Sequence, residues 1–170
     1  MGGSGSGKTT LARRLGEQLD IPHVELDALF HLPGWTPREP EGFRMAVAKA
    51  TAGPEWVACG NYSLVRQQLW ERADTVVWLD LTRRTIMAQV VSRTVRRSVT
   101  REELWNGNRE PWSNLYRLDP ERSIIAWAWT RHRVYADRYA AAMADPRWAA
   151  LRFVRLRSHA EIDRWLASLP

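Results

Sequence analysis

The sequence predicts an α/β domain built on a parallel sheet with helices on both faces, and three observations support this. Short apolar strands alternate with amphipathic helical segments along the chain. The most apolar strand, Thr75 to Leu79, shows no polar alternation, which is typical of a parallel strand covered on both faces. A glycine-rich stretch near the start leads directly into a helical pattern. With 170 residues and no visible repeat or linker, we expect one domain spanning 1–170.

Composition excludes several other classes of protein. Apolar residues make up 45% and charged residues 26%, as in a globular chain. The single cysteine, Cys59, cannot form an internal disulfide and is compatible with a reducing compartment. The apolar runs are too short to span a membrane, and no basic-then-apolar leader precedes the glycine-rich stretch. We therefore expect a cytoplasmic protein without a membrane partner, and the sequence does not indicate its oligomeric state.

The first half of the chain contains three helical and two strand patterns. Leu11, Leu15 and Leu19 are spaced four apart and define one face of a helix at 9–19. The elements that follow are a strand at 23–27, a proline-bracketed loop at 33–40, a helix at 42–52, a buried strand at 56–59, a turn at 60–62 and a helix at 64–71.

The second half begins with the strand at 75–79 and a helix at 82–97. A polar, tryptophan-bearing stretch at 98–118 follows, and its breakers Asn106-Gly107-Asn108 and Pro111 predict a loop or lid. The remaining patterns predict a long helix at 120–143, a strand at 152–156 and a helix at 160–169.

The glycine-rich stretch is a phosphate-binding motif. Residues 2–9 match the P-loop pattern G-x-x-x-x-G-K-[ST], and a chance match in a chain of this composition is roughly one in a thousand. Glycines let backbone N–H groups turn inward around phosphate oxygens, Lys8 neutralises the β and γ phosphates, and the Thr9 hydroxyl binds Mg²⁺. The pattern predicts ATP and Mg²⁺ as cofactors, held by Gly2, Gly3, Ser4, Gly5, Ser6, Gly7, Lys8, Thr9 and Thr10. The alternative is a flexible Gly/Ser start such as the remnant of a tag.

Positive charge also points to an anionic partner. Lysine and arginine exceed the acids by six, and only two of the 25 cations are lysine. The planar guanidinium fork suits phosphate and carboxylate groups, although a general preference for arginine over lysine explains the composition equally well. Position is more informative, because four arginines lie in nine residues without one acid: Arg93, Arg96, Arg97 and Arg101.

These motifs together resemble a known family. Gly2 to Thr9, Leu26-Asp27, Gly60-Asn61-Tyr62, the arginine helix and the stretch 104–110 look like the small P-loop kinases related to adenylate kinase, some of which are labelled DNA topology modulation proteins. The resemblance covers essentially the whole chain. It implies a three-layer P-loop NTPase fold with parallel strand order 2-3-1-4-5 and a helical or loop lid, here at 93–118.

The resemblance also suggests roles for residues at two strand ends. Asp27 ends the second strand, where an acid of such kinases acts as general base, orients the acceptor or holds the metal; Glu25 lies on the same face, but deeper. The alternative for Asp27 is a cap on a helix that starts at Ala28. Asn61 and Tyr62 would help to hold the acceptor, or simply form a turn.

Arginines of the lid are the remaining candidates. Arg93, Arg97 and Arg101 are spaced four apart and share a face if the helix continues. With Arg109 they resemble lid arginines that stabilise the transferring phosphoryl group, Arg93 and Arg97 as catalytic residues and Arg101 and Arg109 as acceptor-binding ones. The alternative is a solvated basic face.

Cys59 departs from the family pattern. Cys59-Gly60 stands where an acid and a glycine are expected, and a thiol is a poor ligand for Mg²⁺. Metal binding then depends on Thr9 with Asp27 alone, or with help from Asp80.

The function expected from these features is transfer of the γ-phosphoryl group of ATP to a small acceptor, most plausibly a nucleotide or a nucleoside. Two alternatives remain open. One is a basic nucleic-acid-binding P-loop protein, suggested by the arginines and by tryptophans in polar loops at Trp35, Trp105 and Trp112. The other is a nucleotide-binding relative with little catalytic activity, suggested by Cys59.

A P-loop normally follows a strand that aims it, but only Met1 precedes Gly2 here. A strand of usual length would add roughly five to eight apolar residues. We therefore expect the first strand of the sheet to be missing, because the start codon was assigned too late or because the chain is truncated.

Overall fold

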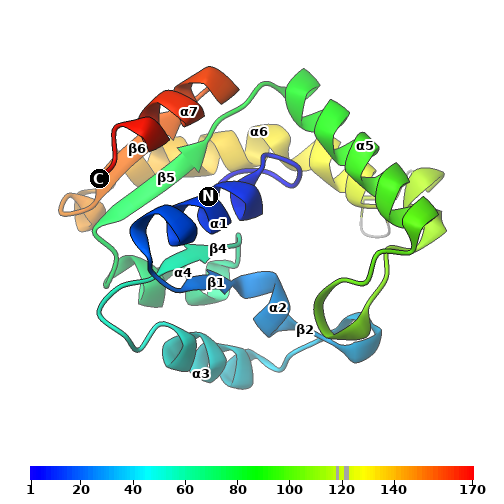
Figure 1. The fold of residues 1–170 in the computed structure, drawn as a ribbon, viewed down its shortest axis with the longest axis horizontal. Helices are drawn as coiled ribbons and strands as arrows, with labels where there is room; N and C mark the ends of the chain where they lie inside the picture. Colours follow the sequence, from blue (N-terminus) through cyan, green and yellow to red (C-terminus); the bar gives the residue numbers. More distant parts are fainter. Residues whose placement is uncertain (118, 121–122) are drawn as a thin grey trace.

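The computed structural model describes residues 1–117, 119–120 and 123–170 (Figure 1). These residues form a mixed α/β fold with short parallel sheets and seven α-helices. In chain order the elements are α1 Lys8–Leu19, β1 His23–Glu25, α2 Leu26–Phe30, β2 His31–Leu32, β3 Thr36–Pro37, α3 Pro40–Ala50, β4 Val57–Cys59, α4 Ser63–Trp70, β5 Thr75–Leu79, α5 Arg83–Thr100, α6 Ile124–Met143, β6 Arg152–Leu156 and α7 His159–Ala167.

Two parallel strand pairs form the centre of the fold. β1 pairs with β4, and β5 pairs with β6 in a register that sets Leu79 opposite Leu156. Between the two pairs lies the start of the chain (Figure 1): Gly2 forms a parallel bridge with Leu79, whose N–H donates to the Met1 carbonyl at 2.9 Å. β2 and β3 form a separate antiparallel hairpin.

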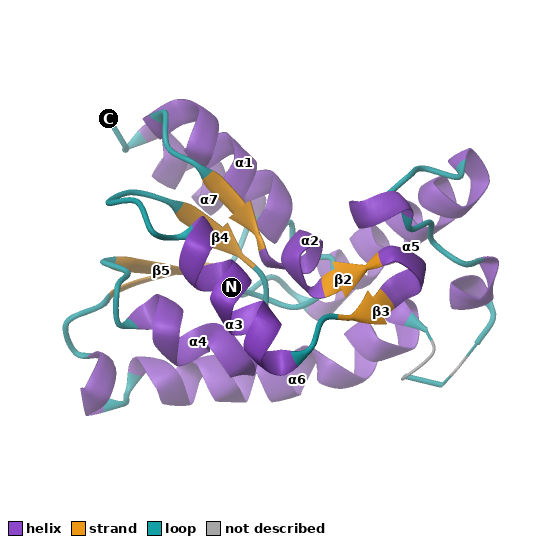
Figure 2. Ribbon diagram, turned by 90° about the horizontal axis from the view of Figure 1, so that it is seen from below, coloured by secondary structure: helices purple, strands orange, loops and turns teal. Residues whose placement is uncertain are grey.

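Helices cover the strands on two sides. Figure 2 shows α1 and α7 on one side of the strands and α6 on the other. Trp78 of β5 is buried and meets Tyr139 of α6 edge-on, with ring centroids 5.9 Å apart. The uninterrupted apolar pattern of β5 reflects this double coverage.

The apolar core is divided into two clusters. One joins α1, β5, β6 and α7 through residues such as Leu15, Leu79 and Leu166. The other joins β1, α3 and α4 around the fully buried Phe43 and Val47. Each strand pair therefore has its own core.

The helix and strand patterns are largely confirmed, but the predicted loop at 33–40 contains β3, the helix predicted at 120–143 begins at Ile124, and two further elements differ in their bounds. The strand predicted at 23–27 ends at Glu25, and Leu26 begins α2, so Asp27 lies in the first turn of a short helix. α5 extends three residues beyond the prediction and ends at Thr100. Arg101 is the C-cap with a left-handed φ of 53°, so the helical face predicted for Arg93, Arg97 and Arg101 does not include Arg101.

The region after the lid is described in part. α6 begins at Ile124, and the Ser123 side chain accepts a hydrogen bond from the Ala126 N–H, an N-cap arrangement. Positions 118, 121 and 122, the first ending the predicted lid and the others within the predicted helix at 120–143, lie outside the described residues. Among the residues described, no helix has the length and apolar character needed to cross a membrane.

Candidate functional site

The glycine-rich stretch forms a tight loop that opens into α1. Gly5 and Gly7 have φ values of 81° and 88°, which side chains rarely allow, and the Ser6 N–H donates to the Gly3 carbonyl at 3.2 Å. A Cβ on Gly5 would lie 3.0 Å from the Val90 Cβ of α5, so glycine also permits close packing there. No side chain caps the N-terminus of α1 and no acid lies in its first turn. These features leave the helix N-terminus suited to an anion.

Lys8 lies at the junction of the loop and α1. Its Nζ donates to the Gly3 carbonyl at 2.8 Å. Burial lowers the pKa of Lys8 to about 8, with Arg93 acting in the same direction and Asp27 opposing it. An anion bound beside the Lys8 ammonium would compensate for the water that burial removes, and it would raise the pKa of Lys8 again.

A cavity of about 680 Å³ extends from the loop to the lid. The side chains that line it come from the glycine-rich loop at 2–9 (the phosphate loop), α2, the β2–β3 hairpin, the turn after β4, α5, the lid and α6. Among the predicted site residues, it brings together Ser4, Lys8, Asp27, Asn61, Tyr62, Arg93 and Arg97. Seven separate parts of the chain therefore converge on one space.

Asp27 and Tyr62 form a short hydrogen bond in this cavity. The Tyr62 hydroxyl donates to Asp27 Oδ1 at 2.6 Å, and His31 Nε2 lies 3.4 Å from the same hydroxyl. Burial and the neighbouring Asp27 carboxylate raise the pKa of Tyr62, so its proton stays in place at neutral pH. The Asp27 carboxylate is thus oriented through one oxygen. The strand-end position expected for Asp27 is replaced by the first turn of α2, which still directs it into the cavity.

Asn61 links the two strand pairs. Its Nδ2 donates to the Gly2 carbonyl, so the turn after β4 is tied to the residue that pairs with β5. Its Oδ1 is buried without a hydrogen-bond partner among the described atoms. The preceding Gly60 allows this turn, because a Cβ there would lie only 2.7 Å from the Leu26 Cβ.

Thr9 faces Glu25 and Cys59. The Thr9 hydroxyl donates to Glu25 Oε1 at 3.1 Å, and the Cys59 Sγ lies 3.8 Å from the same hydroxyl and 3.2 Å from His23 Nε2. Burial raises the pKa of the Cys59 thiol to about 11, so it stays protonated at neutral pH. Glu25, rather than Asp27, is thus the carboxylate beside Thr9.

These oxygens are compatible with Mg²⁺. The described residues contain no group of three or more His, Cys, Asp or Glu side chains arranged around a metal position. Protein-bound Mg²⁺ commonly uses one or two side-chain oxygens with substrate phosphates and water. The Thr9 hydroxyl and the Glu25 carboxylate provide such a pair, whereas Asp80 is engaged by Arg155 at 2.6 Å.

The two inner lid arginines lie on α5 beside the cavity. Arg93 Nη2 lies 3.4 Å from the Ser4 hydroxyl of the phosphate loop, and its Nε has no partner among the described atoms. Burial lowers the pKa of Arg93, with Arg97 adding to the effect. Arg97 approaches Glu102 and the buried Glu110, at 3.7 and 3.8 Å. The Nε atoms of both arginines are buried without a hydrogen-bond partner among the described atoms.

The other predicted arginines lie elsewhere. Arg101 and Arg109 are exposed and do not line the cavity, and Arg109 approaches Glu103 at 4.0 Å. Thr10 is also exposed, on α1. The structure therefore does not bring these three side chains to the site.

The lid closes onto the β2–β3 hairpin. Asn106 Nδ2 donates to the carbonyls of Ala28 and His31, and Asn108 Nδ2 donates to the Leu32 carbonyl at 3.0 Å. The Trp35 N–H donates to Asn108 Oδ1 at 2.7 Å. Asn108 is buried in the docked lid, and Leu104 and Trp105 of the lid line the cavity.

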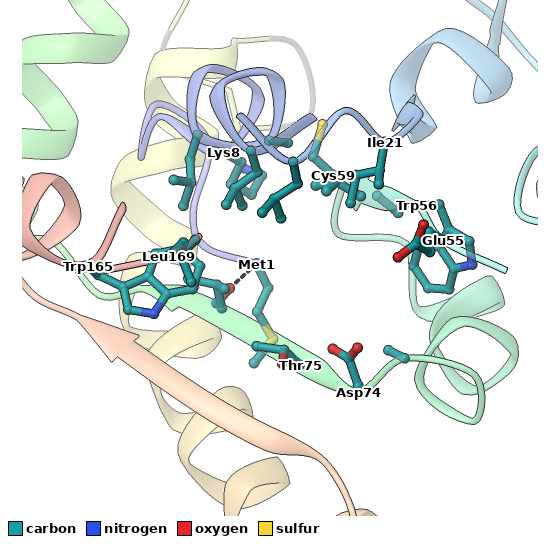
Figure 3. Close-up of a pocket in the computed structure, with 18 of the residues that line it drawn as sticks. Met1, Lys8, Ile21, Glu55, Trp56, Cys59, Asp74, Thr75, Trp165 and Leu169 are labelled. Carbon is teal, nitrogen blue, oxygen red and sulfur yellow. Dashed lines mark hydrogen bonds between the residues drawn. The ribbon is translucent and has the colours of Figure 1, made fainter. Parts of the chain in front are cut away.

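A second cavity, of about 540 Å³, separates the two strand pairs. Figure 3 shows Met1 and Thr75 on the β5 side of this space and Cys59 and Trp56 on the β4 side. Burial lowers the pKa of the Met1 amine to about 5, and this amine donates to the Val77 carbonyl. Lys8 lines both cavities, so the phosphate loop forms the wall between them.

No role is predicted from the sequence for several residues that lie in the site. Glu25 beside Thr9, His31 beside Tyr62 and Glu110 beside Arg97 depend on contacts between distant segments. The only sequence signal for them was position: Glu25 and His31 flank the Leu26-Asp27 motif, and Glu110 lies in the stretch 104–110. Comparisons of the chain with protein-family models, with curated proteins and with solved structures gave no match.

Proposed function

We propose that the protein is an ATP-dependent phosphotransferase with a P-loop kinase fold. The observation that carries the proposal is the convergence of Lys8, Asp27, Arg93 and Arg97 on one cavity next to a glycine loop that opens a helix. Phosphoryl transfer requires cations that neutralise the triphosphate and a carboxylate that orients the attacking hydroxyl group or accepts its proton. The strand pairs β1–β4 and β5–β6, with Gly2 beside Leu79, are compatible with order 2-3-1-4-5, counting the strand before the loop first.

On the triphosphate side, loop N–H groups and the N-terminus of α1 hold the phosphate oxygens. Lys8 would neutralise charge on the β and γ phosphates, and Arg93 and Arg97 would stabilise the charge that spreads over the γ oxygens during transfer. Thr9 and Glu25 would hold Mg²⁺, which when bound neutralises phosphate charge.

On the acceptor side, Asp27 receives the proton of the attacking hydroxyl. Tyr62 occupies Oδ1 of the carboxylate and thereby leaves Oδ2 for the acceptor. The docked lid limits water in the cavity, so that the γ-phosphoryl group is transferred to the acceptor and not to water.

The test is transfer of labelled γ-phosphate from ATP in the presence of Mg²⁺ to a panel of nucleosides, nucleoside monophosphates and simple sugars. We expect transfer to at least one acceptor, and we expect Asp27→Asn to lower kcat by about 100-fold or more, because a proton acceptor is lost. Asp20→Asn, at an exposed helix C-cap, is the matched control and should leave kcat unchanged.

Equal activity of the Asp27→Asn variant would contradict the role of Asp27. Absence of transfer to every acceptor would contradict the proposed function. DNA affinity that falls steeply with salt, without ATP turnover, would favour the nucleic-acid-binding alternative. A rise in a low turnover on Cys59→Asp would favour the alternative of a weakly active relative.

A further inference from the structure

The inference concerns the acceptor, and it rests on the proposed function. The cavity has a charged side and an aromatic side. Ser4, Lys8 and Arg93 belong to the charged side, where Arg93 approaches Ser4 at 3.4 Å. The aromatic side surrounds Asp27, so its chemistry determines which hydroxyl compound approaches the carboxylate.

The described cations that line the cavity all have partners in the phosphate loop or among carboxylates. They are Lys8, which donates to the phosphate loop, Arg93, which contacts Ser4, and Arg97, which lies between Glu102 and Glu110. The exposed Arg101 and Arg109, expected to hold a charged acceptor, do not line the cavity. A phosphate group on the acceptor would therefore be desolvated beside Asp27 without a described cation to compensate it.

The aromatic side is formed by an aromatic cluster of five rings: Phe30, His31, Trp35, Tyr62 and Trp105. His31 lies 5.1 Å from Trp35 and 5.9 Å from Trp105 between ring centroids, and it is nearly parallel to Trp105, at 19°. Phe30 and Tyr62 are 4.6 Å apart. Such a surface favours a flat, uncharged ring that can stack or meet these rings edge-on.

Two buried polar atoms next to this cluster, Asn61 Oδ1 and His31 Nδ1, have no partner among the described atoms, and both accept hydrogen bonds. Asn61 Nδ2 donates to the Gly2 carbonyl, which identifies the unpartnered atom as the carbonyl-type Oδ1. Tyr62 gives its only proton to Asp27, so in its contact with Tyr62 the His31 Nε2 carries the proton. Burial lowers the pKa of His31, and in the neutral ring the unpartnered Nδ1 is then an acceptor. A matching ligand presents N–H or O–H donors.

We propose that the acceptor is a nucleoside-class molecule: an uncharged compound with a planar ring, hydrogen-bond donors for Asn61 and His31, and a free hydroxyl group. The hydroxyl oxygen forms a bond to the γ-phosphorus as the bond from that phosphorus to the β–γ bridging oxygen breaks. ADP leaves with the electron pair of the broken bond, and the hydroxyl proton passes to Asp27. A nucleoside monophosphate is the product of this reaction and a poor acceptor in it.

The experiment compares kcat/KM for adenosine, guanosine, cytidine and thymidine with the values for their 5′-monophosphates, at saturating ATP and Mg²⁺. Mass spectrometry identifies each product. We expect at least one nucleoside to exceed its monophosphate by tenfold or more. A preference for a monophosphate, or transfer only to simple sugars, would overturn the inference and leave the proposed function intact. Absence of any transfer would remove both.

A charge variant tests the same reasoning from the opposite direction. Trp105→Arg places a guanidinium in the aromatic cluster and should raise the ratio of monophosphate to nucleoside kcat/KM by tenfold or more. Trp112→Arg is the matched control, because Trp112 is 47% exposed and does not line the cavity. An unchanged ratio in the Trp105 variant would contradict the cluster as the acceptor site. Nucleoside binding, measured by the quenching of tryptophan fluorescence, shows separately that the variant is folded and able to bind a nucleoside.

Discussion

Lys8 should make the free protein less stable, because it is a cation held in a partly buried position for a ligand. The pKa of Lys8 is lowered from 10.5 to about 8, which corresponds to a cost of about 3 kcal/mol for keeping the charge in the folded protein. Replacing Lys8 by Met keeps most of the side-chain volume and removes the charge, at the loss of one hydrogen bond worth about 1 kcal/mol. We expect Lys8→Met to raise the free energy of unfolding by about 2 kcal/mol at pH 7.

The pH dependence of this difference follows from the direction of the pKa shift. Below pH 8 the lysine is charged in both the folded and the unfolded wild-type chain, so the full cost is present. Between pH 8 and 10.5 the folded protein releases the proton while the unfolded chain keeps it, and wild-type stability therefore rises with pH. The stability advantage of Lys8→Met should disappear over this interval.

Urea unfolding from pH 7 to 10.5 measures the difference, and ATP binding by calorimetry measures its functional counterpart. Loss of the charge-assisted bonds of Lys8 should weaken ATP binding by about 10- to 100-fold. Lys49→Met is the control, because Lys49 is the other lysine of the chain and lies exposed on α3. A Lys8→Met protein that is less stable than wild type at pH 7, or that binds ATP equally well, would refute the reasoning.

Three further predictions concern the site. Arg97→Ala should lower kcat by about 100-fold, whereas the same change at the exposed Arg96 should stay within about twofold; equal losses in steady-state kinetics would contradict a specific role for Arg97. Gly60→Ala should lower the free energy of unfolding by at least about 2 kcal/mol in urea, whereas Gly53→Ala, with no contact closer than 3.8 Å, should be nearly neutral. Glu25→Gln should raise several-fold the Mg²⁺ concentration that gives half-maximal turnover, and an unchanged Mg²⁺ dependence would exclude Glu25 as a ligand.

Local patterns predicted most of the fold because they depend on neighbours along the chain. The helix at Lys8–Leu19 and the strand at Thr75–Leu79 follow from apolar spacing alone. Polar and apolar residues alternate at 23–27, which predicts a strand that includes Leu26 and Asp27, whereas α2 begins at Leu26 and contacts α3. The left-handed C-cap at Arg101 has no sequence signal, since arginine rarely adopts that conformation.

The candidate site was predicted in outline. The P-loop residues follow from a motif of fixed spacing, whereas Asp27, Asn61 and Tyr62 follow from the resemblance to small P-loop kinases. The position of Glu25 beside Thr9 and the cluster of His31 with Trp105 were not, because they depend on how segments distant in sequence fold together. Helical spacing placed Arg93 and Arg97 correctly on one side of α5, but it could not show that the helix ends before Arg101.

The cavity between the strand pairs divides the molecule into two halves, one built on β1 and β4 and the other on β5 and β6. Each half has its own apolar cluster, and α1 contacts β1 and β4 as well as the cluster around β5 and β6. Gly2 connects the two halves, because it pairs with Leu79 on one side and its carbonyl accepts a hydrogen bond from Asn61 on the other. On the proposed function, a nucleotide held by the phosphate loop would bind beside this link, and part of its binding energy would hold the two halves together.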